Sequence, residues 1–214
     1  MELYFAPLAC SLATRISLYE AGAAAASTRF TQVDTRTKRL ANGGDFLAVN
    51  PMGQVPVLRT DAGESLTENT AVLQYVAESF PEAKLAPDGT LARARLREWL
   101  GFIGTELHKA VFVPLLDPNA PEAVKSYARE KLGLRMAVLE KHLSGREFLL
   151  DAFSVADAYL ATILNWTAAT AVSLASWPAV QDYQRRILKR PSVARAFGEE
   201  LALYQAELAR AKAR

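Results

Sequence analysis

The sequence predicts an α/β domain at its N-terminus and an all-helical domain at its C-terminus. Over the first eighty residues, short apolar runs alternate with helical patterns, whereas beyond Thr90 the apolar spacing is helical almost throughout. Between the two patterns, residues 81–89 hold two prolines and a glycine, which is typical of a linker. We therefore expect domains at residues 1–80 and 90–214, joined by a linker at residues 81–89.

Four strands and three helices are expected in the first domain. The strands are expected at residues 3–5, 28–33, 55–58 and 65–66. The helices are expected at residues 11–21, 45–49 and 68–80. Gly22 follows the first helix, and Pro81 ends the last one because a residue before proline is disfavoured in helical conformation.

Five helices are expected in the second domain. They are placed at residues 90–112, 121–143, 154–174 and 178–190, and from residue 191 to the C-terminus. Ser154 and Asp157 have the spacing of a capping box, in which the serine binds a first-turn amide and the acid reaches back to the serine. We therefore interpret Asp157 as a structural residue and not as a catalytic acid.

The composition indicates a globular protein of the cytoplasm. Half of the residues are hydrophobic, and the formal net charge is only +2. No strong field points to nucleic acid, and no apolar stretch approaches the roughly 20 residues of a membrane span. A single cysteine excludes an intramolecular disulfide. Two isolated histidines and one cysteine offer no metal-site spacing, so no metal is expected.

Cys10 falls between the first strand and the first helix. There, the unpaired backbone amides and the positive end of the helix dipole would favour a thiolate. The alternative is a buried and inert cysteine, which is a common environment for a lone thiol. Position alone leaves both interpretations open.

Pro56 interrupts a run that otherwise has the pattern of a strand. It could occupy an edge strand, where the missing backbone donor does no harm. A cis Val55–Pro56 bond would instead leave the backbone of Val55 free to pair with an extended peptide ligand.

Residues 67–69 precede the apolar stripe of the third helix. The first-turn amides could hold a ligand carboxylate while Glu68 meets an ammonium group. The alternative is plain N-capping by Thr67 or Asn69. Of the histidines, His142 is expected at the surface, and His108 is a packing residue unless a site accompanies it.

Taken together, these segments resemble the beta class of bacterial glutathione transferases over essentially the whole chain. Their order and spacing carry the resemblance. The matching stretches are Ala9-Cys10-Ser11-Leu12-Ala13, Val49-Asn50-Pro51-Met52-Gly53-Gln54-Val55-Pro56-Val57-Leu58, Leu66-Thr67-Glu68-Asn69, Glu98-Trp99-Leu100, Thr105-Glu106-Leu107-His108-Lys109 and Phe153-Ser154-Val155-Ala156-Asp157-Ala158-Tyr159-Leu160.

The resemblance implies a thioredoxin-like N-terminal domain that binds glutathione as co-substrate. Val55 and Pro56 would pair with the cysteinyl unit, Glu68 and Asn69 would hold the γ-glutamyl end, and Lys38 would face the glycine carboxylate. Cys10, Ser11 and His108 would lie at the thiol as the catalytic residues. Thr105 would reach the ligand of the neighbouring subunit, which implies a homodimer.

The implied reaction conjugates glutathione to small hydrophobic electrophiles bound against the helical domain, as in detoxification. Because Cys10 could form a mixed disulfide with glutathione, thiol-disulfide exchange is a second plausible reaction. A non-catalytic ligand- or protein-binding member of the same fold is the alternative.

Three residues depart from the family pattern. Gly101 stands where related sequences often carry an asparagine that touches glutathione. Phe5 replaces a tyrosine that is common near the cleft, and Asn69 replaces the usual small residue. The first departure predicts weaker glutathione binding by one hydrogen bond, about 0.5–1.5 kcal/mol.

Overall fold

The computed structural model describes residues 1–212, which divide into two units. The sheet unit consists of Met1–Leu85 and the helix that begins at Pro191. The helical unit consists of Ala86–Arg190. The chain therefore has the expected architecture, an α/β N-terminal part and a helical C-terminal part, but one helix groups differently from the expectation.

A mixed five-stranded sheet forms the centre of the sheet unit, in the order β3-β2-β1-β4-β5. Its strands are β1 (Glu2–Phe5), β2 (Arg29–Asp34), β3 (Arg39–Leu40), β4 (Val57–Arg59) and β5 (Ser65–Leu66). β1 is parallel to β2 and antiparallel to β4, so Leu3 lies between Phe30 and Leu58. Four strands were expected, and the two-residue β3 is the addition.

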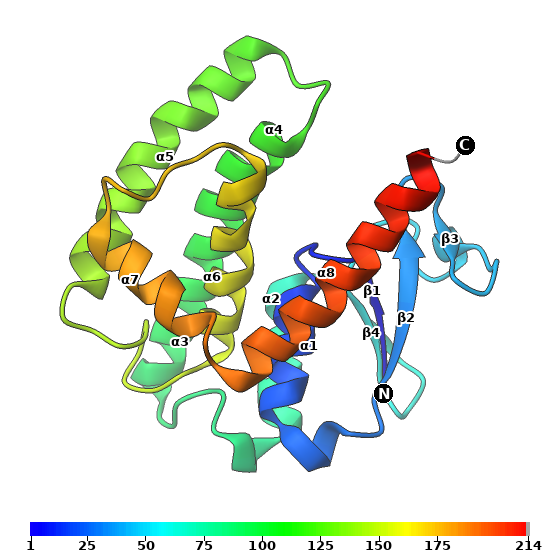
Figure 1. Cartoon of the computed structure of the whole chain (residues 1–214). Coiled ribbons are helices and arrows are strands. Elements are labelled where there is room, and N and C mark those ends of the chain that lie inside the picture. The colour runs from blue at the N-terminus through cyan, green and yellow to red at the C-terminus, as the bar shows by residue number, and fades with distance from the viewer. Residues whose placement is uncertain (213–214) are drawn as a thin grey trace. The chain divides into compact units, whose positions relative to one another are not determined.

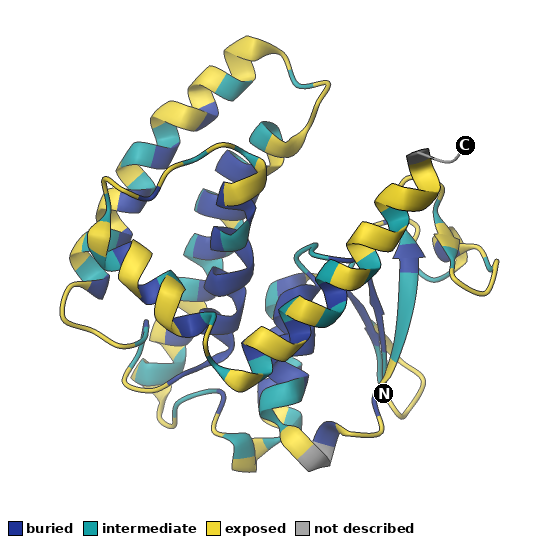
Figure 2. Cartoon of the chain, in the orientation of Figure 1, coloured by how far each residue is buried: buried dark blue, intermediate teal, exposed yellow. Residues whose placement is uncertain are grey.

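The alternation along β1 places apolar side chains on both faces of the sheet. Leu3 and Phe5 pack with residues of α1 (Leu12–Glu20) and α2 (Asn69–Ser79), whereas Tyr4 packs with Phe46 and Val57 on the opposite face. Three 3₁₀ helices complete this part of the unit: Gly22–Ala25, Phe46–Ala48 and Pro81–Ala83. The central strands β1 and β4 are thus mostly buried, whereas β2 is mostly of intermediate exposure and is drawn largely in teal in Figure 2.

The C-terminal helix α8 (Pro191–Lys212) belongs to the sheet unit, where it runs alongside α1 (Figure 1). The hydroxyl of Ser192 donates to Glu20, and Arg15 of α1 is ion-paired with Glu199 and Glu200 of α8. The domain boundaries expected from the sequence place this helix in the all-helical domain instead. Helical periodicity reveals that a helix has an apolar face, but not which domain that face contacts.

The helical unit contains one long composite helix and three further helices. Its elements are α3 (Thr90–Phe102), the π-helix η4 (Ile103–Phe112), α4 (Val113–Leu116), α5 (Glu122–Leu143), α6 (Val155–Asn165), the 3₁₀ helix η5 (Trp166–Ala169) and α7 (Pro178–Ile187). α6 is buried along almost its whole length, whereas α5 has a largely exposed face (Figure 2). The core of this unit is therefore built around α6.

The capping box at the start of α6 is confirmed. The Ser154 hydroxyl accepts the Ala156 amide, and the Asp157 carboxylate accepts the Ser154 amide at 2.9 Å. The same carboxylate, which is fully buried, also accepts from the Leu149 amide and the Tyr183 hydroxyl. Burial raises the pKa of Asp157, and these donors oppose that rise. Asp157 is a structural acid.

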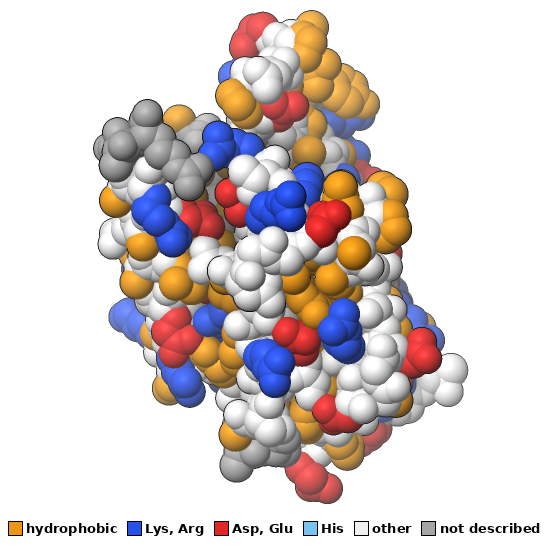
Figure 3. Space-filling view, turned by 90° about the vertical axis from the view of Figure 1, so that its right-hand side faces the viewer, with side chains coloured by type: hydrophobic (Ala, Val, Ile, Leu, Met, Phe, Trp, Pro, Cys, Tyr) orange, Lys and Arg blue, Asp and Glu red, His pale blue; other side chains and the backbone are white. Residues whose placement is uncertain are grey.

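On the face of the molecule drawn in Figure 3, basic and acidic side chains are interspersed among apolar and neutral ones. Because the two signs of charge are mixed, this face carries no strong positive or negative electrostatic field. Among the helices of residues 1–212, none is long and apolar enough to cross a membrane.

Candidate active site

Cys10 lies in the turn between β1 and α1, and its side chain is half-buried. Its Sγ donates to the carbonyl oxygen of Val55 at 3.2 Å. Within the turn, the Leu12 amide donates to Ala9 and the Ala13 amide donates to Cys10. These amides, which the sequence suggested would be unpaired, are therefore already bound. The thiol lies just before the start of α1, with its Sγ on the Val55 carbonyl.

Ser11 supports the turn from within. Its side chain is fully buried, and its hydroxyl accepts the Ala6 amide at 3.2 Å and donates to the Ala6 carbonyl at 3.3 Å. The hydroxyl of Ser11 is thus engaged with backbone on both sides. This geometry gives the Ser11 side chain a structural role.

The loop before Val55 is held in shape by Asn50, a residue that the sequence analysis did not single out. The buried Asn50 amide donates to the Gln54 carbonyl at 2.7 Å, and its oxygen accepts the Met52 amide at 3.1 Å. The signal was present, because an asparagine before a proline often forms such a turn.

The Val55–Pro56 peptide bond is cis, and β4 begins directly after it. β4 lies between β1 and β5, so the interpretation of Pro56 as an edge-strand proline is wrong. Lys38 Nζ donates to the Gly53 carbonyl at 2.9 Å. A Cβ at Gly53 would lie 3.1 Å from the Lys38 side chain, so the glycine allows this approach. Lys38 and Cys10 thus contact the same loop.

Glu68 and Asn69 begin α2 in an unusual way. Glu68 is exposed, has a positive φ of 64°, and makes no side-chain capping bond. The Asn69 side chain is only 7% exposed, yet neither its amide nitrogen nor its oxygen has a partner within the described part of the chain. The alternative of plain N-capping by Thr67 or Asn69 is therefore wrong. A buried amide lacking partners costs about 1–3 kcal/mol.

His108 lies on the π-helix of the helical unit and is buried. Its Nδ1 is 2.7 Å from the Tyr159 hydroxyl, and its ring lies edge-on to Trp166 with centroids 5.0 Å apart. Burial, with a smaller contribution from the Lys109 charge, lowers the pKa of His108 to about 4. The imidazole is therefore neutral at pH 7 and acts as a hydrogen-bonding group, not as a cation.

Thr105 lies on the same π-helix, where its exposed hydroxyl donates to the Gly101 carbonyl at 3.0 Å. A Cβ at Gly101 would have no atom within 4 Å. His142, expected at the surface, is partly buried against Trp99, with ring centroids 4.4 Å apart. Because its Nε2 lies 2.8 Å from the Leu149 carbonyl, its ring is fixed in place.

Phe5 is a core residue of the sheet unit. It is 2% exposed, and the guanidinium carbon of Arg15 lies 4.1 Å from the centre of its ring. The aromatic ring at this position therefore contributes packing to the core.

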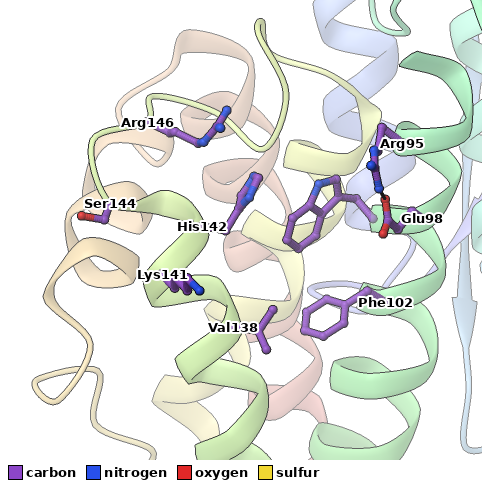
Figure 4. Close-up of a pocket in the computed structure, with 9 residues that line it drawn as sticks. Arg95, Glu98, Phe102, Val138, Lys141, His142, Ser144 and Arg146 are labelled. Atoms are coloured by element: carbon purple, nitrogen blue, oxygen red, sulfur yellow. Dashed lines mark hydrogen bonds and ion pairs between the residues drawn. The ribbon is translucent and has the colours of Figure 1, made fainter. Parts of the chain in front are cut away.

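A hollow of about 710 Å³ lies within the helical unit between α3 and α5 (Figure 4). Phe102 of α3 and Val138 of α5 point toward each other, and Arg95 is ion-paired with Glu98 at 2.7 Å. None of the predicted ligand or catalytic residues lines this hollow. Its lining consists of Arg95, Glu98, Trp99, Phe102, Val138, Lys141, His142, Ser144 and Arg146.

The predicted site residues thus fall into two groups. Cys10, Ser11, Lys38, Val55, Pro56, Glu68 and Asn69 belong to the sheet unit, and Thr105 and His108 belong to the helical unit. Within residues 1–212, no cluster of three or more His, Cys, Asp or Glu side chains could hold a metal ion.

Sequence profiles of two domains match the chain. The N-terminal domain of glutathione S-transferases matches residues 1–78, and the C-terminal domain of glutathione S-transferases matches residues 105–191.

Individual proteins match along most of their length. Glutathione S-transferase GstA of Escherichia coli O157:H7 is 40% identical over 94% of this chain and 98% of its own. A sphingomonad glutathione S-transferase complexed with glutathione is 44% identical with a TM-score of 0.88, and the match covers 94% of this chain and 98% of that one. The beta-class enzyme of Sphingomonas chungbukensis is also 44% identical, with a TM-score of 0.87 and the same coverage.

Proposed function

Because the chain belongs to the glutathione S-transferase family, we propose that it transfers the glutathione thiolate to small hydrophobic electrophiles. The observation that carries the proposal is the buried Asn69 amide, which has neither donor nor acceptor satisfied within the described chain. A polar group in that state is stabilised by a ligand that supplies the missing partners. An amino-acid head group supplies both.

In this proposal, Glu68 and Asn69 hold the γ-glutamyl end of glutathione. Glu68 meets the ammonium group, while Asn69 and the first turn of α2 meet the carboxylate. The positive φ of Glu68 supports this assignment, because strained backbone is retained mainly where a function requires it.

The middle of the tripeptide is assigned to Val55 and Pro56, and its glycine end to Lys38. The Val55 carbonyl accepts from the half-buried Cys10 thiol, and a ligand amide N–H could donate to the same carbonyl. The Lys38 ammonium lies two residues along the same loop, on the Gly53 carbonyl. A cation there suits a terminal carboxylate.

Catalysis in this scheme consists of stabilising the glutathione thiolate. The N-terminal end of α1 at Cys10 lowers the pKa of a nearby thiol, and each pKa unit corresponds to about 1.4 kcal/mol. His108 is assigned to the same sulfur. If Tyr159 donates to Nδ1, the imidazole proton lies on Nε2, which becomes the donor available to the thiolate. Ser11 contributes by shaping the turn.

The electrophile is assigned to the aromatic surroundings of His108. The Trp166 ring lies edge-on to both His108 and Phe112, with centroids 5.0 and 6.2 Å apart. Such rings favour an apolar and flat molecule. The substrate class is therefore small hydrophobic electrophiles, for which a chloronitroarene is a suitable probe.

Cys10 supports thiol-disulfide exchange as a second activity. Its thiolate would attack the glutathionyl sulfur of a mixed disulfide between glutathione and a substrate thiol, forming the Cys10–glutathione mixed disulfide and releasing the substrate thiolate. The thiolate of a free glutathione would then attack the Cys10–glutathione disulfide, releasing the Cys10 thiolate and forming glutathione disulfide. An increase in mass of one glutathionyl group, absent in a Cys10→Ser variant, is the expected signature. No adduct in excess glutathione disulfide would contradict this activity.

We also propose that the protein is a homodimer in which Thr105 contacts the glutathione bound to the neighbouring subunit. The Thr105 hydroxyl is exposed and donates only along its own helix in the described chain, so it can reach outward. Sedimentation velocity gives the assembly state. A Thr105→Val variant that stays dimeric but binds glutathione more weakly is expected, and a monomeric wild type would contradict the assignment.

The decisive experiment is calorimetric titration of reduced glutathione into the wild type, Glu68→Ala and the matched control Glu64→Ala. Glu64 is also exposed and lies in the turn before β5, outside the proposed site. We expect micromolar-to-millimolar binding that Glu68→Ala weakens by about tenfold or more and that Glu64→Ala leaves intact. No binding to the wild type would favour a non-catalytic member of the fold.

A further inference from the structure

Glu200, near the end of the chain, is a buried acid that contacts the turn carrying Cys10. It lies on α8 and its side chain is fully buried. One carboxylate oxygen accepts the backbone amide of Leu8 at 2.7 Å. The other lies 3.0 Å from Nε of Arg15. A single side chain thus connects α8, α1 and the turn two residues before the thiol.

Arg15 provides the balancing charge and is itself held in place. Its guanidinium lies over the rings of Phe5 and Phe30, 4.1 and 4.3 Å from their centroids. It also pairs with Glu199 at 3.2 Å. A buried carboxylate is tolerated when its charge is paired and hydrogen-bonded. In Glu200, Oε2 accepts the Leu8 amide and Oε1 is ion-paired with Arg15.

The turn that Glu200 contacts is held from two sides. Leu8 has a positive φ of 59°, a conformation that a leucine adopts only when its surroundings impose it. From within, the Ser11 hydroxyl binds the Ala6 backbone. From outside, Glu200 binds the Leu8 amide. Cys10 lies between these two attachments, with its Sγ on the Val55 carbonyl.

We propose that Glu200 is a positioning residue for the Cys10 thiol: its bond to the Leu8 amide fixes the turn so that the thiol stays on the Val55 carbonyl. This rests on the thiol role given to Cys10 above, but not on glutathione binding. The geometric and electrostatic contributions of Glu200 can be separated. Glu200→Gln keeps the side-chain length and an acceptor oxygen but removes the charge. Glu200→Asp keeps the charge but shortens the side chain by about 1.5 Å, so its carboxylate no longer reaches the Leu8 amide.

The experiment measures Cys10 alkylation by iodoacetamide as a function of pH. Because the chain has one cysteine, the reaction reports Cys10 alone. A thiol that leaves the Val55 carbonyl loses a bond that favours its protonated form. We therefore expect Glu200→Asp to accelerate alkylation at pH 7 by about tenfold and to shift the midpoint by about one pH unit downward. Glu200→Gln should stay within about twofold of the wild type.

Glu199→Gln is the matched control, because Glu199 also pairs with Arg15 but does not contact Leu8. It should leave the pH profile unchanged. A folded Glu200→Asp protein with the wild-type profile would overturn the proposal. So would equal shifts in Glu200→Gln and Glu199→Gln, which would indicate an effect of charge.

Amide hydrogen exchange keeps the proposal testable if Glu200→Asp fails to fold. The Leu8 amide should be protected from exchange in both the wild type and Glu200→Gln. If it exchanges as fast as an exposed amide in either protein, the proposal is overturned. None of these measurements uses glutathione. A failure of the proposed transferase function would therefore leave their outcome unaffected.

Discussion

The Sγ of Cys10 lies 3.2 Å from the carbonyl oxygen of Val55, although 45 positions separate the two residues in the chain. The contact joins the turn before α1 to the loop before β4. In the proposed complex, the same carbonyl pairs with the ligand backbone. Ligand binding and thiol position are therefore coupled through one carbonyl group.

Cys10→Ala should lower the conjugation rate without unfolding the protein. The lost sulfur hydrogen bond is weak, so the free energy of unfolding should fall by less than about 1 kcal/mol. We expect kcat/KM with a chloronitroarene to fall by about tenfold, because the glutathione thiolate loses the Cys10 side chain as a neighbour that helps to position it. Unchanged kinetics would remove Cys10 from the mechanism of conjugation.

Asn69→Leu should stabilise the free protein and weaken glutathione binding. Removing the buried amide, which has no partner in the described chain, should raise the free energy of unfolding by about 1–3 kcal/mol. Glutathione affinity should fall by about tenfold or more, whereas Asn69→Ser should retain most of it. Urea unfolding and calorimetry measure the two effects. A less stable Asn69→Leu protein would indicate that water already satisfies the amide.

Gly101→Asn should strengthen glutathione binding. A Cβ at Gly101 meets no atom within 4 Å, so a side chain can begin there without a clash. One regained hydrogen bond of about 0.5–1.5 kcal/mol predicts an affinity about 2- to 10-fold higher. Gly133→Asn is the control, because this glycine of α5 is equally unobstructed. From helix propensities, Gly101→Asn and Gly133→Asn should each stabilise the protein by about a few tenths of a kcal/mol. Only Gly101→Asn should change the affinity for glutathione.

His108 should make the protein less stable in acid. Its folded pKa is about 4, below the usual 6.5, so the unfolded chain binds the proton more readily between these values. The stability due to neutral His108 is therefore complete above pH 6.5 and is lost as pH falls toward 4, by at most about 3 kcal/mol. Unfolding of the wild type and His108→Gln across this range measures the difference, and a difference independent of pH would contradict the assignment.

Glu200 changes the stability with pH in the opposite direction to His108, so the two contributions must be measured separately. Burial raises its pKa to about 7, against the opposing effect of Arg15. Its folded form therefore holds a proton that the unfolded chain releases above pH 4.5, and stability decreases as pH rises toward 7. In the wild type the two slopes partly cancel. Only the difference between the wild type and the His108 variant isolates the histidine.

Much of the fold could be predicted from the sequence because local patterns determine it. Leu12, Ile16 and Leu18 lie in α1 and are buried, and Ser154 with Asp157 marks the start of α6. The two-residue strand β3 was not predicted, whereas the equally short β5 was, because a turn with a glycine at residues 61–63 marks where β5 begins. The π-helix was also missed, because apolar spacing alone does not distinguish it from an α-helix.

The candidate site was only partly predictable for the same reason. Cys10, Pro56 and Glu68 are found at element boundaries, which local signals identify. The state of Asn69 depends on which side chains surround it. The bond between Glu200 and Leu8 joins positions 192 residues apart, and no local pattern encodes such a partner.

The grouping of α8 with the sheet has a consequence for synthesis. Arg15 is synthesised long before Glu199 and Glu200, the two acids that pair with it, because Glu199 follows it by 184 positions. Until α8 leaves the ribosome, the newly made sheet carries a cation between two aromatic rings without its counter-charges. The sheet unit can therefore form all of its contacts only after the helical unit, which lies between its two segments in the sequence, has been translated.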